Sequence, residues 1–209
     1  MPNNDTLVVT TMISLFFDIE TTGLPPRGVK PEENTFDKYD KCRIVSIAWT
    51  LRNESTVYSQ NYMIVDPGES YMYEKIGAEF IHNISREMVG KYGKPVKQVL
   101  ELFMRDVEAA DSVIAHNLSF DRTITLAELY RLGDIDNARI LHNTPGICTM
   151  LSTVDIVKCP GKFSSSYKWP KLQELYKFLF DENFDNAHCA LDDVFALVKC
   201  YYKIEYLLN

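Results

Sequence analysis

The spacing of the apolar residues changes between residues 65 and 96, and this change constrains the fold most. Before it, β-branched and aromatic residues gather in short runs at 14–19, 43–53 and 57–65, a pattern that predicts strands. After it, apolar residues recur every three or four positions, as in an amphipathic helix: Val96, Val99, Leu100, Phe103 and Val107. The chain therefore begins with strands and continues with helices between strands.

The connections between these segments predict the topology. Residues 43–53 and 57–65 are joined by only three residues, so we expect an antiparallel hairpin. Further strands at 112–115 and around Ile147 are reached only through helical segments, which is the pattern of parallel crossovers. We expect an α/β fold with a mixed sheet of about five strands flanked by helices.

Capping residues and apolar spacing place three more helices in the second half of the chain. Ser119 is a candidate cap for a helix that Gly133 ends. Residues 171–180 and 190–208 carry the apolar spacing of two final helices.

No Gly/Ser-rich linker and no internal repeat divides the chain. We therefore expect an N-terminal tail at residues 1–12 and a single domain at residues 13–209. A long polar loop at residues 25–42 interrupts this domain, and long loops of this kind are often functional. The loop could gate a site, bind a partner or have no role.

Charge and cysteine content limit the class of protein. The 22 Lys and Arg residues are outnumbered by 29 Asp and Glu residues, which gives a net charge of -7. This acidity argues against a general electrostatic binder of nucleic acid, because such binding neutralises many phosphates. The five cysteines form no CxxC pair, which argues against a zinc cluster or disulfide framework and favours a reducing, intracellular setting.

Targeting and membrane signals are absent from the sequence. The first 17 residues contain no Lys or Arg and run directly into Asp18 and Glu20, unlike a secretory signal peptide. No apolar run approaches the ~18 residues of a transmembrane helix. We expect a cytoplasmic protein without a membrane partner, and a nuclear location stays open.

The first candidate site lies at the end of the first strand. Asp18 and Glu20 are two residues apart, so their side chains share one face of the strand, just before a Thr-Thr-Gly turn. Two carboxylates on one face of a buried strand repel each other and are stable as anions mainly with a cation between them. The alternative is that the strand has ended and both side chains face water.

Two later groups of residues are weaker candidates by themselves. Asp121 falls in the first turn of a predicted helix, where the helix dipole favours an acid with or without a function. Asp193 lies at the edge of the apolar stripe of the last helix, whereas Asp192 lies on the solvent side. His188 precedes this helix and can point to the same place as Asp193, although a loop histidine fixed by hydrogen bonds is the alternative.

Together, these groups resemble the three motifs of the DEDDh 3′-to-5′ exonucleases in order and spacing. The motif residues are Asp18 and Glu20 in FDIETTG, Asp121 in AHNLSFD, and His188 and Asp193 in HCALDD. Residues 81–85 and 169–172 also resemble the segments that precede two helices of this family. The resemblance spans residues 14–202, nearly the whole chain.

The resemblance implies a ribonuclease H-like fold and two divalent metal ions per site, Mg²⁺ or Mn²⁺. It implies four metal ligands: Asp18, Glu20, Asp121 and Asp193. His188 would be the general base that takes a proton from the attacking water, and the product would be a nucleoside 5′-monophosphate. The residue types agree, because hard cations prefer oxygen ligands.

The resemblance also implies contacts with the 3′ end of a single-stranded nucleic acid. Seven residues would make them: Thr21, Thr22, Gly23, Leu24, His82, Ile84 and Asn117. The backbone of the Thr-Thr-Gly turn would hold the terminal nucleotide, with Leu24 packed on its base. Core packing is the alternative for Leu24 and Ile84, and the motifs do not distinguish DNA from RNA.

Three functions are compatible with these residues, and a free-standing 3′-to-5′ exonuclease is favoured. A proofreading subunit would need a separate polymerase or another replication, repair or RNA-processing partner. A catalytically silent nucleic-acid-binding relative predicts the loss of a ligand or of the histidine, and all five residues are present. Bound divalent cations would make the site attract phosphate despite the acidic chain.

Overall fold

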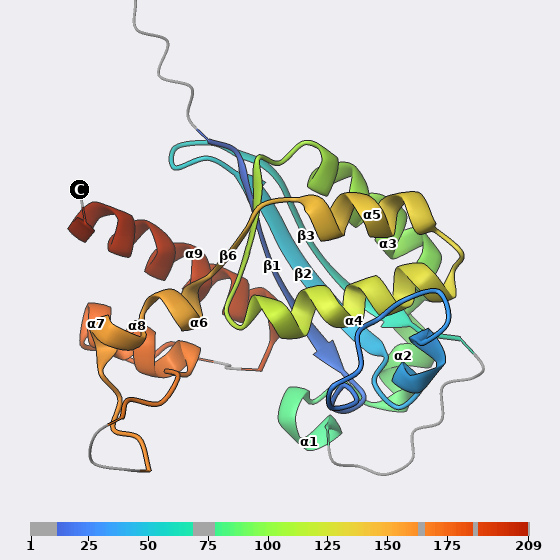
Figure 1. Cartoon of the computed structure of the whole chain (residues 1–209), viewed down its shortest axis with the longest axis horizontal. Coiled ribbons are helices and arrows are strands. Elements are labelled where there is room, and N and C mark those ends of the chain that lie inside the picture. Colours follow the sequence, from blue (N-terminus) through green and yellow to red (C-terminus); the bar gives the residue numbers. More distant parts are fainter. Residues whose placement is uncertain (1–11, 69–77, 163–165, 186–187, 209) are drawn as a thin grey trace, which may run out of the picture.

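The β-branched runs form the strands of a mixed sheet (Figure 1). The computed structural model describes residues 12–68, 78–162, 166–185 and 188–208. Its strands are β1 (Ser14–Thr21), β2 (Ile44–Arg52), β3 (Val57–Asp66), β4 (Lys94–Pro95), β5 (Ser112–Ala115) and β6 (Gly146–Cys148). Within the described residues their order is β4-β3-β2-β1-β5-β6. This confirms the predicted α/β fold and adds β4, which the sequence did not reveal.

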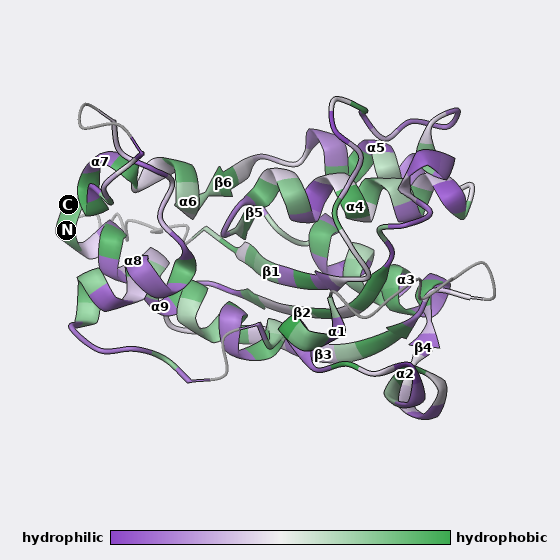
Figure 2. Ribbon diagram, turned by 90° about the horizontal axis from the view of Figure 1, so that it is seen from below, coloured by the Kyte–Doolittle hydropathy of each residue, from purple (hydrophilic) through white to green (hydrophobic). Residues whose placement is uncertain are grey.

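Helices flank the sheet on both faces (Figure 1). The helices are η1 (Phe36–Tyr39), α1 (Glu79–His82), α2 (Arg86–Tyr92), α3 (Val96–Glu108), α4 (Leu118–Arg131), α5 (Ile135–Asn143), α6 (Thr149–Ser152), α7 (Val154–Val157), α8 (Leu172–Phe180) and α9 (Ala190–Leu208). Figure 2 shows that α4 and α9 alternate between hydrophobic and hydrophilic residues, as expected for helices that cover a sheet with one side only.

Strand β1 is buried on both faces, and its alternation decides where its acids point. Leu15, Phe17 and Ile19 belong to the core cluster that α3, α4 and α5 complete. Phe16 points the other way and packs against α9. Because side chains alternate along a strand, Asp18 and Glu20 share the face of Phe16 and point toward α9.

The carboxyl end of β1 lies where the strand order reverses. Strand β1 pairs antiparallel with β2 on one side and parallel with β5 on the other. The chain therefore runs outward through the β2–β3 hairpin, as predicted, and returns through α3 to β5. In open α/β sheets, ligands bind outside the carboxyl ends of strands at such a point.

The predicted polar loop at residues 25–42 is ordered and packed against α4. Arg131 of α4 forms an ion pair with Asp40 at 2.6 Å and donates a hydrogen bond to the carbonyl oxygen of Phe36 at 2.9 Å. Tyr39 is buried and donates from its hydroxyl to the carbonyl oxygen of Val29. The loop is thus fixed by specific contacts and contains the short helix η1.

A buried ion pair connects this loop to the sheet and to α4. The Arg43 guanidinium donates to both carboxylate oxygens of Glu128, at 2.6 and 2.9 Å. The carbonyl oxygen of Arg43 also accepts a hydrogen bond from the backbone N–H of Thr22. Removing one member of such a pair leaves the other charge buried and unpaired, which costs about 3–5 kcal/mol of stability. The pair therefore fixes the Thr-Thr-Gly turn relative to α4.

The start of α4 differs from the prediction. The helix begins at Leu118, and its N-cap is Asn117 in the left-handed conformation (φ 75°), so Ser119 lies inside the first turn. Asparagine tolerates this conformation better than most residues, which is a signal that the Ser119 prediction overlooked. Gly133 has φ 70° after the helix, as expected for a helix stop.

Several short elements were not predicted, among them α1, α2, α5, α6 and α7. Most span only four to nine residues, too few for apolar spacing to distinguish them from loops. Capping would have revealed α2, because the Ser85 hydroxyl accepts a hydrogen bond from the N–H of Met88. The predicted tail, apart from Met12, lies outside the described residues.

Candidate active site

Asp18 and Glu20 line a cavity of about 910 Å³ at the end of β1, which we call the acidic cavity. Residues of β1, α1, α4, α8 and α9 and of the segments before these last three helices form its wall. Strand β1 supplies the two acids on one face, as the two-residue spacing predicts. The carboxyl end of β1 is therefore accessible, although the strand itself is buried.

Helix α9 brings Asp193 and His188 to the same place. The backbone N–H of His188 donates a hydrogen bond to Asp193 Oδ2 at 3.0 Å, which fixes the residue before the helix. His188 has φ 71°, a left-handed conformation that a non-glycine residue adopts at a cost. Side-chain ligand atoms of Glu20, His188 and Asp193 all lie within 4.8 Å of one another. Asp193 is buried and lines the cavity, whereas Asp192 is absent from its described wall, as the helical spacing predicts.

Helix α4 contributes Asp121 from its first turn. Its side chain is only 2% exposed, and its Oδ1 accepts a hydrogen bond from the backbone N–H of Ile19 at 3.2 Å. The Asn117 cap turns the chain from β5 into α4, so that Asp121 approaches the middle of the Asp18–Glu20 segment. Three chain segments more than 60 residues apart therefore deliver one acidic cluster.

The cluster is electrostatically unfavourable without a cation. Burial raises the pKa of Asp18 well above 3.8, and the neighbouring Asp121 and Asp193 raise it further. Burial raises the pKa of Glu20 to about 8, again with contributions from Asp193 and Asp121. Burial also raises the pKa of Asp121 to about 8 and that of Asp193 to about 6, opposed by the hydrogen bonds from backbone N–H groups. A bound cation would offset both causes.

The donor set fits hard divalent cations. Four carboxylates from three elements face one cavity, and none of them forms an ion pair with Lys or Arg among the described residues. Clustered acids without basic partners are the arrangement that Mg²⁺ and related ions stabilise. The site can therefore hold metal ions through carboxylate oxygens.

The Thr-Thr-Gly turn forms one wall of the cavity. The Thr21 hydroxyl donates to the carbonyl oxygen of Gly23, and the Thr22 hydroxyl donates to that of Lys41. A Cβ on Gly23 would lie 2.7 Å from the Lys41 oxygen, so the turn requires glycine. Leu24 follows the turn and is 83% exposed in the cavity wall. Exposed leucine at this position is not explained by core packing.

The two predicted contacts after β3 occupy different surroundings. His82 lines the cavity, and its Nδ1 accepts a hydrogen bond from the N–H of Ile84 at 3.1 Å. Burial lowers the pKa of His82, and a hydrogen bond with the backbone of Thr21 opposes this shift. Ile84 packs in the core against Val45 and Val89 and is absent from the described cavity wall. The structure therefore shows the core-packing alternative for Ile84.

The cavity wall includes residues to which the sequence assigned no role. Phe120, Met150, Trp169 and Pro170 all line it. Residues 169 and 170 were noted only as part of a segment that resembles one of this family. An aromatic residue two positions before a helix cap was the available signal, but its exposure depends on tertiary packing.

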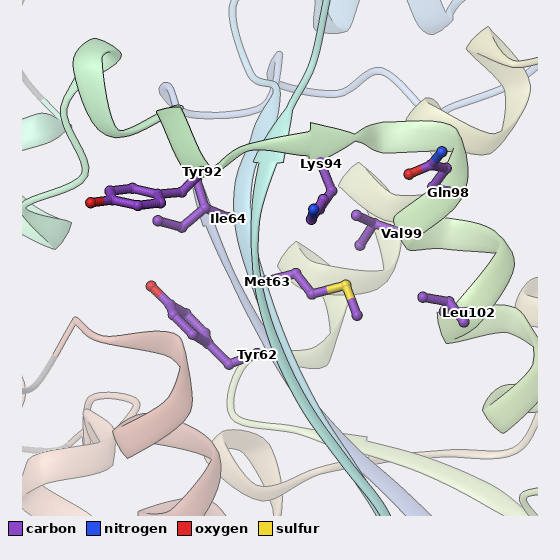
Figure 3. Close-up of a pocket in the computed structure, with 8 residues that line it drawn as sticks. All are labelled: Tyr62, Met63, Ile64, Tyr92, Lys94, Gln98, Val99 and Leu102. Carbon is purple, nitrogen blue, oxygen red and sulfur yellow. The ribbon is translucent and has the colours of Figure 1, made fainter. Parts of the chain in front are cut away.

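A second cavity of about 520 Å³ lies at the edge of β3, beside the end of α2, β4 and α3 (Figure 3). Its described wall contains no carboxylate: Tyr62, Met63, Ile64, Tyr92, Lys94, Gln98, Val99 and Leu102. Figure 3 shows Met63 and Val99 facing each other across the gap between β3 and α3. This cavity, which we call the β3-edge cavity, lacks the chemistry of the acidic one.

A comparison with protein families shows to which family the chain belongs. The profile of the RNase_T family, described as Exonuclease, matches residues 15–201. The chain belongs to the exonuclease family. This confirms the resemblance that the three motifs indicate, and it places the chain among the nuclease hydrolases, for which divalent metal ions are implied. A comparison with curated proteins found no match.

Solved exonuclease structures confirm the fold. E. coli Exonuclease I in complex with a dT13 oligonucleotide has a TM-score of 0.70 and 16% identity, covering 92% of this chain and 40% of that one. The zinc-bound E. coli ExoI–ssDNA complex has a TM-score of 0.68 and 17% identity, covering 94% and 41%. A product-bound exonuclease I has a TM-score of 0.71 and 15% identity, covering 94% and 44%. This exonuclease-family chain thus spans less than half the length of these relatives.

The membrane prediction can be compared with the structure in one respect. None of the helices in the described part of the chain is both long and apolar enough to cross a bilayer.

Proposed function

We propose that this exonuclease-family chain is a metal-dependent 3′-to-5′ exonuclease of the DEDDh type. It releases nucleoside 5′-monophosphates from single-stranded DNA or RNA ends. The observation that carries the proposal is the convergence of four carboxyl groups and His188 on one cavity. The similarity of the fold to exonuclease I bound to single-stranded oligonucleotides supports the choice of substrate.

The four acids have one role in this proposal, which is to hold Mg²⁺ or Mn²⁺. The ligands are Asp18, Glu20, Asp121 and Asp193. When bound, such ions neutralise phosphate charge and lower the pKa of a bound water. The raised pKa values of the acids support this role, because groups that repel each other in the free protein gain most from a cation.

His188 is the general base. Its imidazole takes the proton of the attacking water and releases it to solvent, to which the side chain is open. The hydrogen bond from its backbone N–H to Asp193 couples its position to a metal ligand. This bond holds the backbone of the proposed base beside a proposed metal ligand.

The cavity wall provides the substrate contacts of the proposal. The backbone of Thr21, Thr22 and Gly23 holds the 3′-terminal nucleotide, and exposed Leu24 packs against its base. His82, in the same wall beside Thr21, contacts a polar group of the nucleotide. Asn117 approaches the next nucleotide, and Ile84 acts only from the core, by fixing His82.

The direct test uses single-stranded DNA and RNA labelled at the 5′ end, with Mg²⁺ or Mn²⁺ and with EDTA. We expect a ladder that shortens from the 3′ end, release of 5′-monophosphates and complete inhibition by EDTA. Cleavage that proceeds from the 5′ end, or that survives EDTA, would contradict the proposal. If activity appears only after a polymerase is added, the chain is a proofreading subunit.

Two neighbouring acids provide a matched control for this test. Asp193→Asn removes a proposed ligand without changing side-chain size, and we expect nucleotide release to be lost. Asp192→Asn changes the adjacent acid, which lies outside the described cavity wall, and should retain nucleotide release. If Asp193→Asn released nucleotides as fast as Asp192→Asn and the wild type, Asp193 would not be a metal ligand.

A further inference from the structure

Trp169 is an exposed aromatic residue in the wall of the acidic cavity. Its side chain is 63% exposed, whereas the only other tryptophan, Trp49, is 1% exposed in the core. Single exposed apolar side chains are common on protein surfaces, but this indole lies in a cavity with the proposed metal ligands. Leu24, also highly exposed, lines the same cavity.

The backbone on both sides of Trp169 is fixed. The N–H of Lys168 donates to the carbonyl oxygen of Cys159 at 3.0 Å. The N–H of Lys171 donates to Glu174 Oε2 at 2.8 Å, and the Lys168 ammonium pairs with the same carboxylate. An exposed side chain on a fixed backbone loses little entropy when a ligand covers it, so it can serve as a preformed contact surface.

His116 provides the contact that holds this segment against the body of the protein. Its Nε2 lies 2.9 Å from the carbonyl oxygen of Pro170, and its Nδ1 lies 3.0 Å from the Thr149 hydroxyl. A neutral imidazole meets both partners, by donating to the carbonyl oxygen and accepting from the hydroxyl. Burial favours this form, because it lowers the pKa of His116 to about 4.

The position of the segment decides which part of a strand it can meet. Trp169 lies just before α8, whereas Leu24 follows β1, and Figure 1 shows α8 set apart from the end of β1. The Thr-Thr-Gly turn after β1 is already assigned to the terminal nucleotide. The part of the wall before α8 is therefore left for a nucleotide further from the 3′ end, with Lys171 in the same part of the wall for a phosphate.

We propose that Trp169 stacks on a base of the bound single strand upstream of the terminal nucleotide, and that His116 is its positioning residue. The inference rests on the proposed exonuclease function and names a substrate contact for it. Stacking on an indole suits any base, because every base offers a π face. Stacking would let this acidic chain bind nucleic acid without many contacts to phosphate.

Tryptophan fluorescence tests the contact directly, because only two tryptophans are present and Trp49 is buried. The wild-type protein is titrated with a ten-residue oligo(dT) in Ca²⁺, which replaces Mg²⁺ to limit cleavage. We expect quenching that saturates in the wild type and is absent in Trp169→Phe. Quenching that persists unchanged in Trp169→Phe would come from Trp49 and would overturn the inference.

Kinetics separate a substrate contact from a structural role. Trp169→Ala should raise the KM for oligo(dT) at least about fivefold and leave kcat within about twofold, while Trp169→Phe retains most of the affinity. His116→Ala should raise the KM in the same direction and weaken the quenching. Phe178→Ala, an exposed aromatic of α8 outside the described cavity wall, should match the wild type.

The outcomes distinguish this inference from the proposed function. A wild-type protein that neither binds nor shortens the strand would overturn both. Strand shortening with an unchanged KM in Trp169→Ala would overturn the stacking contact alone. If Trp169→Ala fails to fold, the wild-type quenching and the Trp169→Phe variant still decide the question.

Discussion

The two cavities differ in the part of the sheet that forms them. The acidic cavity lies at the carboxyl end of β1, where the chain leaves the sheet and three distant segments converge. The β3-edge cavity lies along the edge of β3, with Tyr62 and Tyr92 on one side of the strand and α3 on the other (Figure 3). Both walls include apolar side chains, but only the first gathers carboxyl groups with raised pKa values.

This difference shows where the fold can hold acids that repel one another. Along β3 most side chains are exposed or half-exposed, so a charged group there would meet water and would not need a cation. At the end of β1 the buried pairing is complete, so mutually repelling acids can be held by backbone hydrogen bonds such as that from Ile19 to Asp121. Groups that destabilise the free protein are common at functional sites, because a ligand offsets the cost.

The largest effect is expected from Asp18→Asn. Nucleotide release should fall at least about 10³-fold, because the variant loses a carboxylate ligand of the proposed metal site. In EDTA, the same variant should unfold at a higher temperature than the wild type, because a buried carboxyl that its neighbours repel has become neutral. Strand-shortening assays and thermal unfolding measure the two effects. A variant that keeps its activity, or melts well below the wild type, contradicts the account of the acidic cavity.

His188→Gln should lower kcat by about 10²–10⁴-fold, because the proposed general base is removed while the acids remain. The KM for oligo(dT) should change much less, since His188 is assigned to chemistry and not to strand binding. Steady-state kinetics in Mg²⁺ measure both quantities. A rise in KM with an unchanged kcat would make His188 a binding residue instead.

The stability of the metal-free protein should depend on pH in a defined direction. In the unfolded chain the acids ionise near 3.8 and 4.5, whereas in the folded chain Asp193 ionises at about 6 and Glu20 and Asp121 at about 8. Between these values the folded state binds more protons than the unfolded state, so the free energy of unfolding falls as pH rises. We expect the free energy of unfolding to fall throughout this range and to level off only at pH values above those at which Glu20 and Asp121 ionise in the folded chain.

Metal addition provides the control for this pH dependence. Chemical denaturation in EDTA should show the loss, and denaturation in Mg²⁺ should show a smaller one, because bound cations favour the ionised acids. Asp18→Asn should also flatten the profile. Stability in EDTA that rises from pH 4 to pH 8 would show that the acids are not repelling one another.

The smallest effect is expected in the β3-edge cavity. Tyr92→Ala removes an exposed side chain from its wall, and we expect strand shortening like that of the wild type and a change in stability within about 0.5 kcal/mol. The same kinetic and unfolding assays apply. A raised KM for oligo(dT) in this variant would extend substrate binding to the β3 edge and remove the contrast between the cavities.

Much of the fold was predictable because its long elements carry strong local signals. The β2–β3 hairpin and helices α3, α8 and α9 follow from apolar spacing and short connections. The two-residue strand β4 has no comparable signal, because it forms only by pairing with Val65 and Asp66. The start of α4 at Asn117 depended on a backbone conformation that the sequence only hinted at.

The candidate site was predictable to a different degree. The acids and His188 stand out because their residue types and spacing indicate a common chemistry, and the structure gathers them in one place. Ile84 illustrates the limit, because an apolar residue has the same local pattern in a core as in a binding wall. Trp169 illustrates the reverse case, since only the fixed segment around it reveals an exposed aromatic in the cavity.

From the sequence follow the order of the longer strands and helices, the family and the chemistry of the motif acids. These properties reside in local spacing and residue type, which the chain carries before it folds. The tertiary structure decided which side chains share a cavity, how far their pKa values shift and which apolar residues stay exposed. Those properties depend on burial and on distances between segments far apart in sequence, and only the packed sheet and helices set them.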